Sequence, residues 1–273
     1  MAHPLAGVRA KLKRATKHLR ELNAKAAAFL GSDPYRIDVE PEDDPRYVGW
    51  HRATFRIVRY PPFELGVIVG EVFGQYRSAL DHLMVRLIRL NQISGRVKFP
   101  IYPDGVYWVP NKEGRVPRDR LARLVRSEHL AVFDRLYPRP DQRRRRVLMT
   151  RPHALVMTQW VSNFDKHELV RPSFLAPRQM GVSMEPRVGL FEWVHSPAAN
   201  LYDGALLYRV KFVSEGEVDV PYRLVPDLTF GEPPHEWIAP LTVRLAGARI
   251  RSIVQSFVRV TPELRERDDA NPN

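Results

Sequence analysis

Two short clusters of polar residues are the part of this sequence that could do chemistry. They are Arg77-Ser-Ala-Leu-Asp-His82 and Asn163-Phe-Asp-Lys-His167. A guanidinium can hold a phosphate, and an imidazole that titrates near neutral pH can move a proton. An Arg and a His on one helix therefore suggest acid–base chemistry at a phosphate.

Spacing within the first cluster determines which of its side chains can meet. Arg77 and Asp81 are one helical turn apart and can pair, whereas Arg77 and His82 lie about 140° apart around the axis and would flank a groove. The candidate catalytic residues are Arg77, His82 and Asp81. The alternative is a surface ion pair between Arg77 and Asp81 beside a partly buried His82, with no catalytic role.

The second cluster adds acidic and imidazole groups that could support the first or bind a metal. Asp81 and His82 together with Asp165 and His167 make a two-Asp, two-His set of a kind that binds Zn, Mn or Fe. Asn163 and Asp165 are also common turn and cap residues at helix ends. Neither His-x3-His nor Glu-x2-His spacing occurs there, so we expect no metal and no other cofactor.

The charge of the chain predicts a polyanionic partner. The net charge is +12, and the excess of basic over acidic residues is concentrated in 1–30 and 115–151. We therefore expect RNA or another polyanion as partner, bound without sequence readout. The candidate contacts are Arg139, Arg143, Arg144, Arg145, Arg146 and Arg151. The alternative is a solvated basic loop that has no partner.

Composition excludes several classes of protein. With no Cys among 273 residues, the chain has no disulfide framework, thiolate nucleophile or Cys-ligated metal. No apolar run approaches the roughly 20 residues that span a bilayer, and the basic start lacks the apolar segment of a signal peptide. We therefore expect a cytoplasmic protein that does not engage a membrane. Phosphate-loop, dinucleotide, zinc-protease and serine-hydrolase motifs are absent from the sequence.

Apolar residues that recur at spacings of three and four predict four longer helices. One runs from Leu5 to Phe29 and is basic on its other faces, and another has its buried seam from Val69 to Leu90. The expected bounds of the four are 5–30, 63–92, 151–164 and 241–259. Two shorter helices are expected within 117–136, the second with Ser127 as its N-cap.

Alternating residues predict β structure between the helices. A hairpin is expected over 35–60, and short strands are expected within 180–230. The expected strands of the second region are Val182–Met184, Leu190–Val194, Ala205–Val213 and Val218–Val225. The predicted fold is α+β: a helical bundle of the four longer helices with an inserted β-hairpin and a flanking antiparallel sheet. We expect one domain over 1–262 and a frayed tail over 263–273.

The Arg77–His82 motif on a predicted bundle helix resembles the signature of the HEPN superfamily, in which a His follows an Arg after a few residues. This resemblance implies a small helical domain that is often a homodimer. It also implies metal-independent endoribonuclease activity, with Arg and His from two protomers converging on the scissile phosphate. Asp81 would orient one of these two groups.

A longer set of motifs resembles an uncharacterised family of bacterial, mostly actinobacterial, proteins. Its landmarks are Gly70–Leu83, Phe99–Ile101, Leu136–Pro138 and Asn163–His167. This resemblance supports the architecture and implies no activity. The leading expectation is an HEPN-like ribonuclease or RNA-processing or defence protein. The alternatives are a non-catalytic bundle that binds RNA or protein, and a metal-dependent enzyme built on the Asp/His set.

Overall fold

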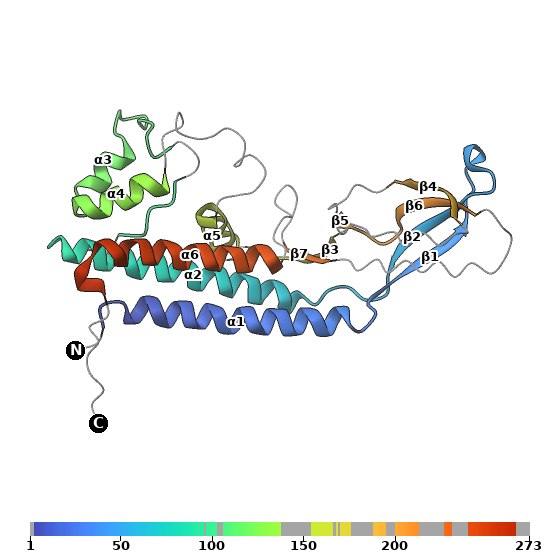
Figure 1. The fold of residues 1–273 in the computed structure, drawn as a ribbon, viewed down its shortest axis with the longest axis horizontal. Helices are drawn as coiled ribbons and strands as arrows, with labels where there is room; N and C mark the ends of the chain where they lie inside the picture. Colours follow the sequence, from blue (N-terminus) through green and yellow to red (C-terminus); the bar gives the residue numbers. More distant parts are fainter. Residues whose placement is uncertain are drawn as a thin grey trace, which may run out of the picture. The chain divides into compact units, whose positions relative to one another are not determined.

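The computed structural model describes most of the chain and confirms the α+β class. The described residues are 3–95, 97–102, 106–137, 154–165, 168, 170–175, 188–194, 200–212, 227–230 and 240–265. Within them lie six α-helices and two antiparallel sheets (Figure 1). The helices are α1 (Ala6–Leu30), α2 (Phe63–Leu90), α3 (Pro117–Ala122), α4 (Ser127–Leu136), α5 (Ala154–Phe164) and α6 (Pro240–Val260).

The predicted helices agree with the structure to within a few residues. Residues 151–153, at the start of the third predicted long helix, lie outside the described residues. The predicted N-cap of α4 is wrong, because Ser127 is already helical and Arg126 occupies the cap position without a side-chain cap bond. Arg126 instead donates from Nη2 and Nε to the carbonyl oxygen of Leu90, at 2.7 and 3.0 Å, and so joins the start of α4 to the end of α2.

The larger sheet contains the predicted hairpin. Strands β1 (Tyr35–Pro41) and β2 (His51–Ile57) pair antiparallel, and the strand order is β1-β2-β6-β4 with β4 (Val188–Trp193) and β6 (Ala205–Phe212). The predicted hairpin and the predicted antiparallel sheet are therefore not separate, because β1 and β2 belong to the same sheet as β4 and β6. Strand β2 is an inner strand of this sheet, because it pairs with β1 on one side and with β6 on the other, and its Ala53 and Phe55 are fully buried.

A second sheet was not predicted. It has the order β5-β3-β7 and consists of β3 (Pro172–Leu175), β5 (Asn200–Leu201) and β7 (Asp227–Phe230). These strands have two to four residues, which is too short for an alternating pattern to become visible. The predicted strands Val182–Met184 and Val218–Val225 lie outside the described residues.

The chain divides into two compact units. The helical unit comprises Met1–Arg20, Ile68–Glu168 and Leu241–Asn273, and the sheet unit comprises Glu21–Val67 and Leu169–Pro240. The single domain expected over 1–262 stays a prediction. All described residues of the two polar clusters belong to the helical unit, so that unit determines their surroundings.

The core of the helical unit confirms the predicted seams. The middles of α1, α2 and α6 are buried along the expected positions, while Leu12, Leu90 and Val260 are only half-buried. Helices α2 and α6 approach each other closely, because a Cβ added to Gly247 would lie 2.1 Å from the hydroxyl oxygen of the fully buried Tyr76. The expected four-helix bundle as a whole stays a prediction.

The end of the described chain is more ordered than expected. Pro262–Leu264 form a 3₁₀ turn in which the Leu264 side chain is fully buried. Glu263 pairs with Arg126 at 2.7 Å. The predicted frayed tail is therefore wrong for Glu263 and Leu264, because a single apolar side chain anchors the turn after α6; residues 266–273 lie outside the described residues.

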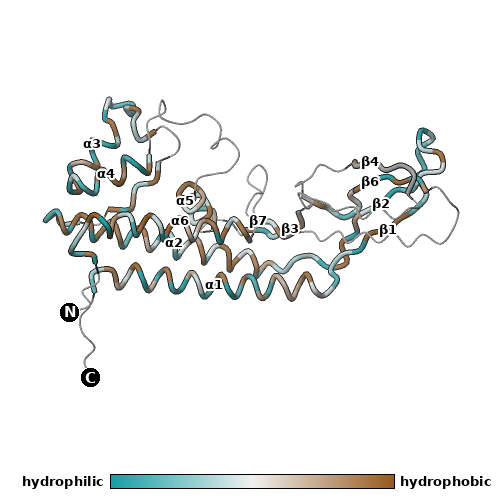
Figure 2. Tube along the Cα trace, viewed as in Figure 1, coloured by the Kyte–Doolittle hydropathy of each residue, from teal (hydrophilic) through white to brown (hydrophobic). Residues whose placement is uncertain are grey.

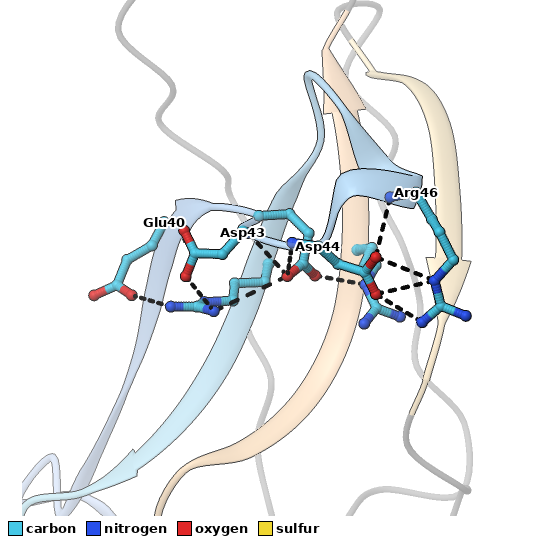
Figure 3. A network of polar contacts seen from close by, with 7 residues as sticks. Glu40, Asp43, Asp44 and Arg46 are labelled. Atoms are coloured by element: carbon cyan, nitrogen blue, oxygen red, sulfur yellow. Dashed lines mark hydrogen bonds and ion pairs between the residues drawn. The ribbon is translucent and has the colours of Figure 1, made fainter.

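In the sheet unit, a network of ion pairs ties the connection between β1 and β2 to β6 (Figure 3). Arg209 of β6 donates from Nε to Oε2 of Glu42 at 2.5 Å, and its guanidinium lies over the ring of Tyr47. Burial acts to raise the pKa of Glu42. The hydrogen bonds from Arg209 and from backbone N–H groups, together with the charge of Arg209, outweigh burial and lower this pKa below its usual value.

Candidate functional site

Arg77 is held inside the helical unit by two partners. Its Nη1 donates to Oε1 of Gln159 on α5 at 2.7 Å, and its Nη2 lies 3.2 Å from Oδ1 of Asp81. Its side chain is 12% exposed and that of Asp81 is 30% exposed. The ion pair expected from the spacing is therefore present, but it is largely buried and not on the surface.

Asp81 joins α2 to the segment that follows it. The backbone N–H of Phe99 donates to Asp81 Oδ1 at 2.8 Å, so this oxygen contacts both Phe99 and Arg77. Phe99 is fully buried, with its ring centroid 5.2 Å from that of Phe133. Asp81 thus has the contacts of a group that fixes a loop against a helix.

His82 lies on a different face of α2 from Arg77. Its side chain is exposed, and a Cβ added to Gly7 of α1 would lie 2.7 Å from its Nδ1. The ring therefore packs directly on the backbone of α1, at a place where only a glycine leaves room. The structure thus gives His82 an exposed position where the plainer sequence interpretation expected partial burial.

Asp165 is not placed with the first cluster. Its carboxylate packs on Gly70 of α2, where an added Cβ would lie 1.9 Å from Oδ1. Gly70 precedes Asp81 by eleven residues, or about 16 Å along the helix axis. Among the residues that the structure describes, no group of three or more His, Cys, Asp or Glu could hold a metal.

The remaining candidate residues are either exposed or outside the described part of the chain. Asn163 is exposed near the end of α5. His167 and the candidate RNA contacts Arg139, Arg143, Arg144, Arg145, Arg146 and Arg151 lie outside the described residues.

The surroundings of Asp165 include a pair that the sequence did not reveal. Asp165 is exposed as a residue, but its carboxylate packs on α2, and this partial loss of solvent, followed by the negative charge of Glu71, raises its pKa. Glu71 Oε2 lies 3.1 Å from Nδ1 of His18, and Arg14 Nε donates to His18 Nε2 at 3.0 Å. The feature of the sequence that could have pointed to this pair is His18, which directly precedes Leu19 of the buried seam of α1.

The solvent face of α1 is strongly basic. Residues 3–20 contain six Lys or Arg and no Asp or Glu. Four of these are exposed at spacings of four, four and three and therefore share one face: Arg9, Lys13, Lys17 and Arg20. Hydrophilic and hydrophobic residues alternate along α1 in Figure 2. Within the described residues, no ion pair is recorded for Lys13, Lys17 or Arg20, so their charges face solvent.

Helix α6 adds to this positive charge. It contains four Arg and no Asp or Glu, and all four Arg are exposed. Arg244 and Arg251 are seven residues apart and share a face. Arg251 of α6 and Arg9 of α1 line the same groove. The basic surface is defined here as Arg9, Lys13, Lys17, Arg20, Arg244 and Arg251.

The sequence predicted the charge near the N-terminus but not this surface. The RNA contacts were predicted in the loop instead, because the run of four Arg at 143–146 is the more conspicuous feature of the sequence. What was missed is the regular spacing of Lys and Arg on the exposed side of the first helix. That spacing was readable from the same periodicity that predicted the buried seam.

Comparison of the chain with protein-family models, with curated proteins and with solved structures finds no match in any of the three. In the part of the chain that the structure describes, no helix combines the length and the apolar character that crossing a membrane requires.

Proposed function

We propose that this chain is a non-catalytic RNA-binding protein, which holds the phosphate backbone on the basic surface of α1 and α6. The observation that carries this proposal is the row of exposed cations on α1, with no acidic residue between 3 and 20. Such a surface gives salt-dependent affinity without sequence readout. We place this activity in the cytoplasm, since the chain has no Cys.

The contacts of Arg77 favour a binding role over a catalytic one. A guanidinium that stabilises a scissile phosphate must reach the substrate, but Arg77 is 12% exposed and bonded to Gln159 and Asp81. Releasing it would leave Asp81 without its cation partner in a largely buried place, which is costly. In this proposal Arg77 and Asp81 stabilise the fold and do not contact RNA.

The test is a salt titration of RNA affinity with a single-stranded oligonucleotide. For single strands, log K falls with log salt by about 0.7 for each phosphate contacted. Changing Lys13, Lys17 and Arg20 to Ser should therefore reduce the slope by about 2 and weaken binding at low salt. The matched control changes Lys112, Arg115 and Arg249 to Ser, which removes the same charge from exposed positions outside the basic surface. Equal effects of both triple variants, or an unchanged slope, would contradict the proposal.

A second candidate function is the HEPN-like, metal-independent endoribonuclease. The observation that favours it is the exposed ring of His82, which packs on Gly7, two residues before Arg9 of the basic surface. An imidazole at the border of a phosphate-binding surface could move a proton at a ribose hydroxyl. In this function Arg77 would stabilise the transition state, Asp81 would orient it, and the enzyme would act as a homodimer.

The ribonuclease is tested by cleavage of RNA in the presence of EDTA. The expected products end in 2′,3′-cyclic phosphate, and His82→Ala is expected to lower the rate by about 10²–10⁴ while the melting temperature stays unchanged. Absence of cleavage by the unchanged protein, with RNA binding retained, would leave only the binding function.

A further inference from the structure

A groove lies between the N-terminal part of α1 and the C-terminal part of α6. Its volume is about 330 Å³, at the small end of the range for small-molecule sites. All of its lining residues belong to the helical unit. They are Leu5, Val8, Arg9, Leu12, Arg251, Val254, Gln255, Val258, Leu264 and Arg265.

The groove has an aliphatic lining. Six of the lining residues are Leu or Val, and Val8, Val254 and Leu264 among them are at most 5% exposed. No aromatic side chain lines it, so the stacking that nucleobases use is not available there. An aliphatic chain would gain affinity by covering this apolar surface.

The polar residues of the groove are positively charged or neutral. Three Arg and one Gln are present, and no carboxylate is among the lining residues. Arg265 donates from Nη2 to the carbonyl oxygen of Arg259 at 2.7 Å, which fixes the position of its guanidinium. Arg251 is exposed, and its guanidinium can turn toward a ligand. This arrangement favours an anion and disfavours a cation.

We infer that the groove binds a free, medium-chain fatty carboxylate. The hydrocarbon chain would lie against Leu12, Val254 and Val258, and the carboxylate would accept hydrogen bonds from Arg251. Because Arg251 also belongs to the basic surface, an occupied groove would lower the affinity for a polyanion. The inference itself does not depend on RNA binding, because the aliphatic lining and the Arg residues carry it.

The test measures binding of carboxylates to the full chain by calorimetry, with monomeric decanoate as the first probe. Octanoate, decanoate and dodecanoate should show an increase in affinity of about fourfold for each methylene that enters the groove, with a plateau once it is filled. Arg251→Ser should weaken decanoate binding about tenfold or more. The matched control is Arg249→Ser, two residues away and on another face of the same helix, which should leave binding unchanged.

A second variant tests the apolar part of the site. Val258→Phe adds bulk at a half-buried lining position and should abolish decanoate binding, while far-UV circular dichroism verifies that the helices remain. Equal effects of Arg251→Ser and Arg249→Ser would overturn the inference. So would equal binding of decyltrimethylammonium, or binding to phosphatidylglycerol vesicles without binding of monomeric decanoate. A failed RNA titration leaves these results standing, so the two proposals can fail separately.

Discussion

Asp81 has one oxygen that contacts two groups from different parts of the helical unit. Its Oδ1 accepts from the Phe99 backbone and lies 3.2 Å from Arg77. The i, i+4 pair was predictable from the sequence, because such spacing brings side chains together on any helix. Gln159, Phe99 and Gly7 were not predictable as partners, since only the tertiary fold brings them to the motif.

Removing the Asp81 carboxylate is expected to destabilise the fold. Asp81→Ala leaves the Phe99 N–H and the Arg77 guanidinium without this acceptor and should cost about 2–3 kcal/mol in the free energy of unfolding. Asp81→Asn keeps a neutral acceptor and should cost less. Urea denaturation measures both variants, with Arg89→Ala, an exposed position of the same helix, as control. If Asp81→Ala unfolds like the unchanged protein but loses RNA cleavage, the catalytic interpretation is the right one.

The lowered pKa of Glu42 predicts that the sheet unit loses stability in acid. This pKa is lowered in the folded state, so the stabilisation that Glu42 provides is present above the unfolded value of 4.5 and is lost as pH falls through the folded pKa. Glu42→Gln should therefore lower the melting temperature at neutral pH. The difference from the unchanged protein should shrink as the pH falls below 4.5. A difference that stays constant over this range would mean that the ion pair with Arg209 is not its source.

At the scale of elements, long amphipathic helices were the most predictable feature. The three- and four-residue spacing extends over several turns in α1, α2 and α6, so the pattern is strong and the bounds differ by at most two residues. The short strands β3, β5 and β7 carry no such pattern, and they form through pairing with strands distant in sequence. The N-cap at Ser127 failed because a tertiary bond from Arg126 determines where α4 begins.

Replacement of Gly by Ala is expected to have opposite effects on stability at two positions within the helices. Gly247→Ala places a methyl group 2.1 Å from the Tyr76 hydroxyl oxygen and should destabilise by about 1–3 kcal/mol through overpacking. Gly74→Ala meets no atom within 4 Å and should stabilise by about 0.5–1 kcal/mol, because alanine favours the helix. Thermal and denaturant unfolding compare the two variants. Equal shifts in the same direction would mean that α6 does not approach α2 at this point.

At the scale of the whole molecule, the two compact units share two continuous helices. Residues 6–20 of α1 belong to the helical unit and 21–30 to the sheet unit, and α2 is divided in the same way after Val67. The buried seam of α1 continues across this division, with Ala15 on one side and Leu22 on the other. Unfolding of either unit would therefore remove packing partners from a helix that also belongs to the other unit.

We expect the chain to unfold in one cooperative transition. Because α1 and α2 extend through both units, unfolding of one unit should propagate along them to the other. Differential scanning calorimetry should give a van't Hoff enthalpy equal to the calorimetric enthalpy. Tryptophan fluorescence and far-UV circular dichroism should report the same midpoint. Two resolved transitions would show that the units are independent domains and that the expectation of one domain over 1–262 is wrong.

The close approach of α6 to Tyr76 also bears on how this sequence can change over evolution. The Tyr76 hydroxyl is buried, and no hydrogen-bond partner is recorded for it among the described residues. A phenylalanine at 76 would remove both this hydroxyl and the nearest atom to a side chain at 247. The ring carbon Cζ of residue 76 would still lie 2.8 Å from a Cβ at 247, so Phe at 76 eases the clash without removing it. Glycine is therefore expected to persist at 247 in every lineage that keeps an aromatic ring at 76, and to become replaceable only where that ring is lost.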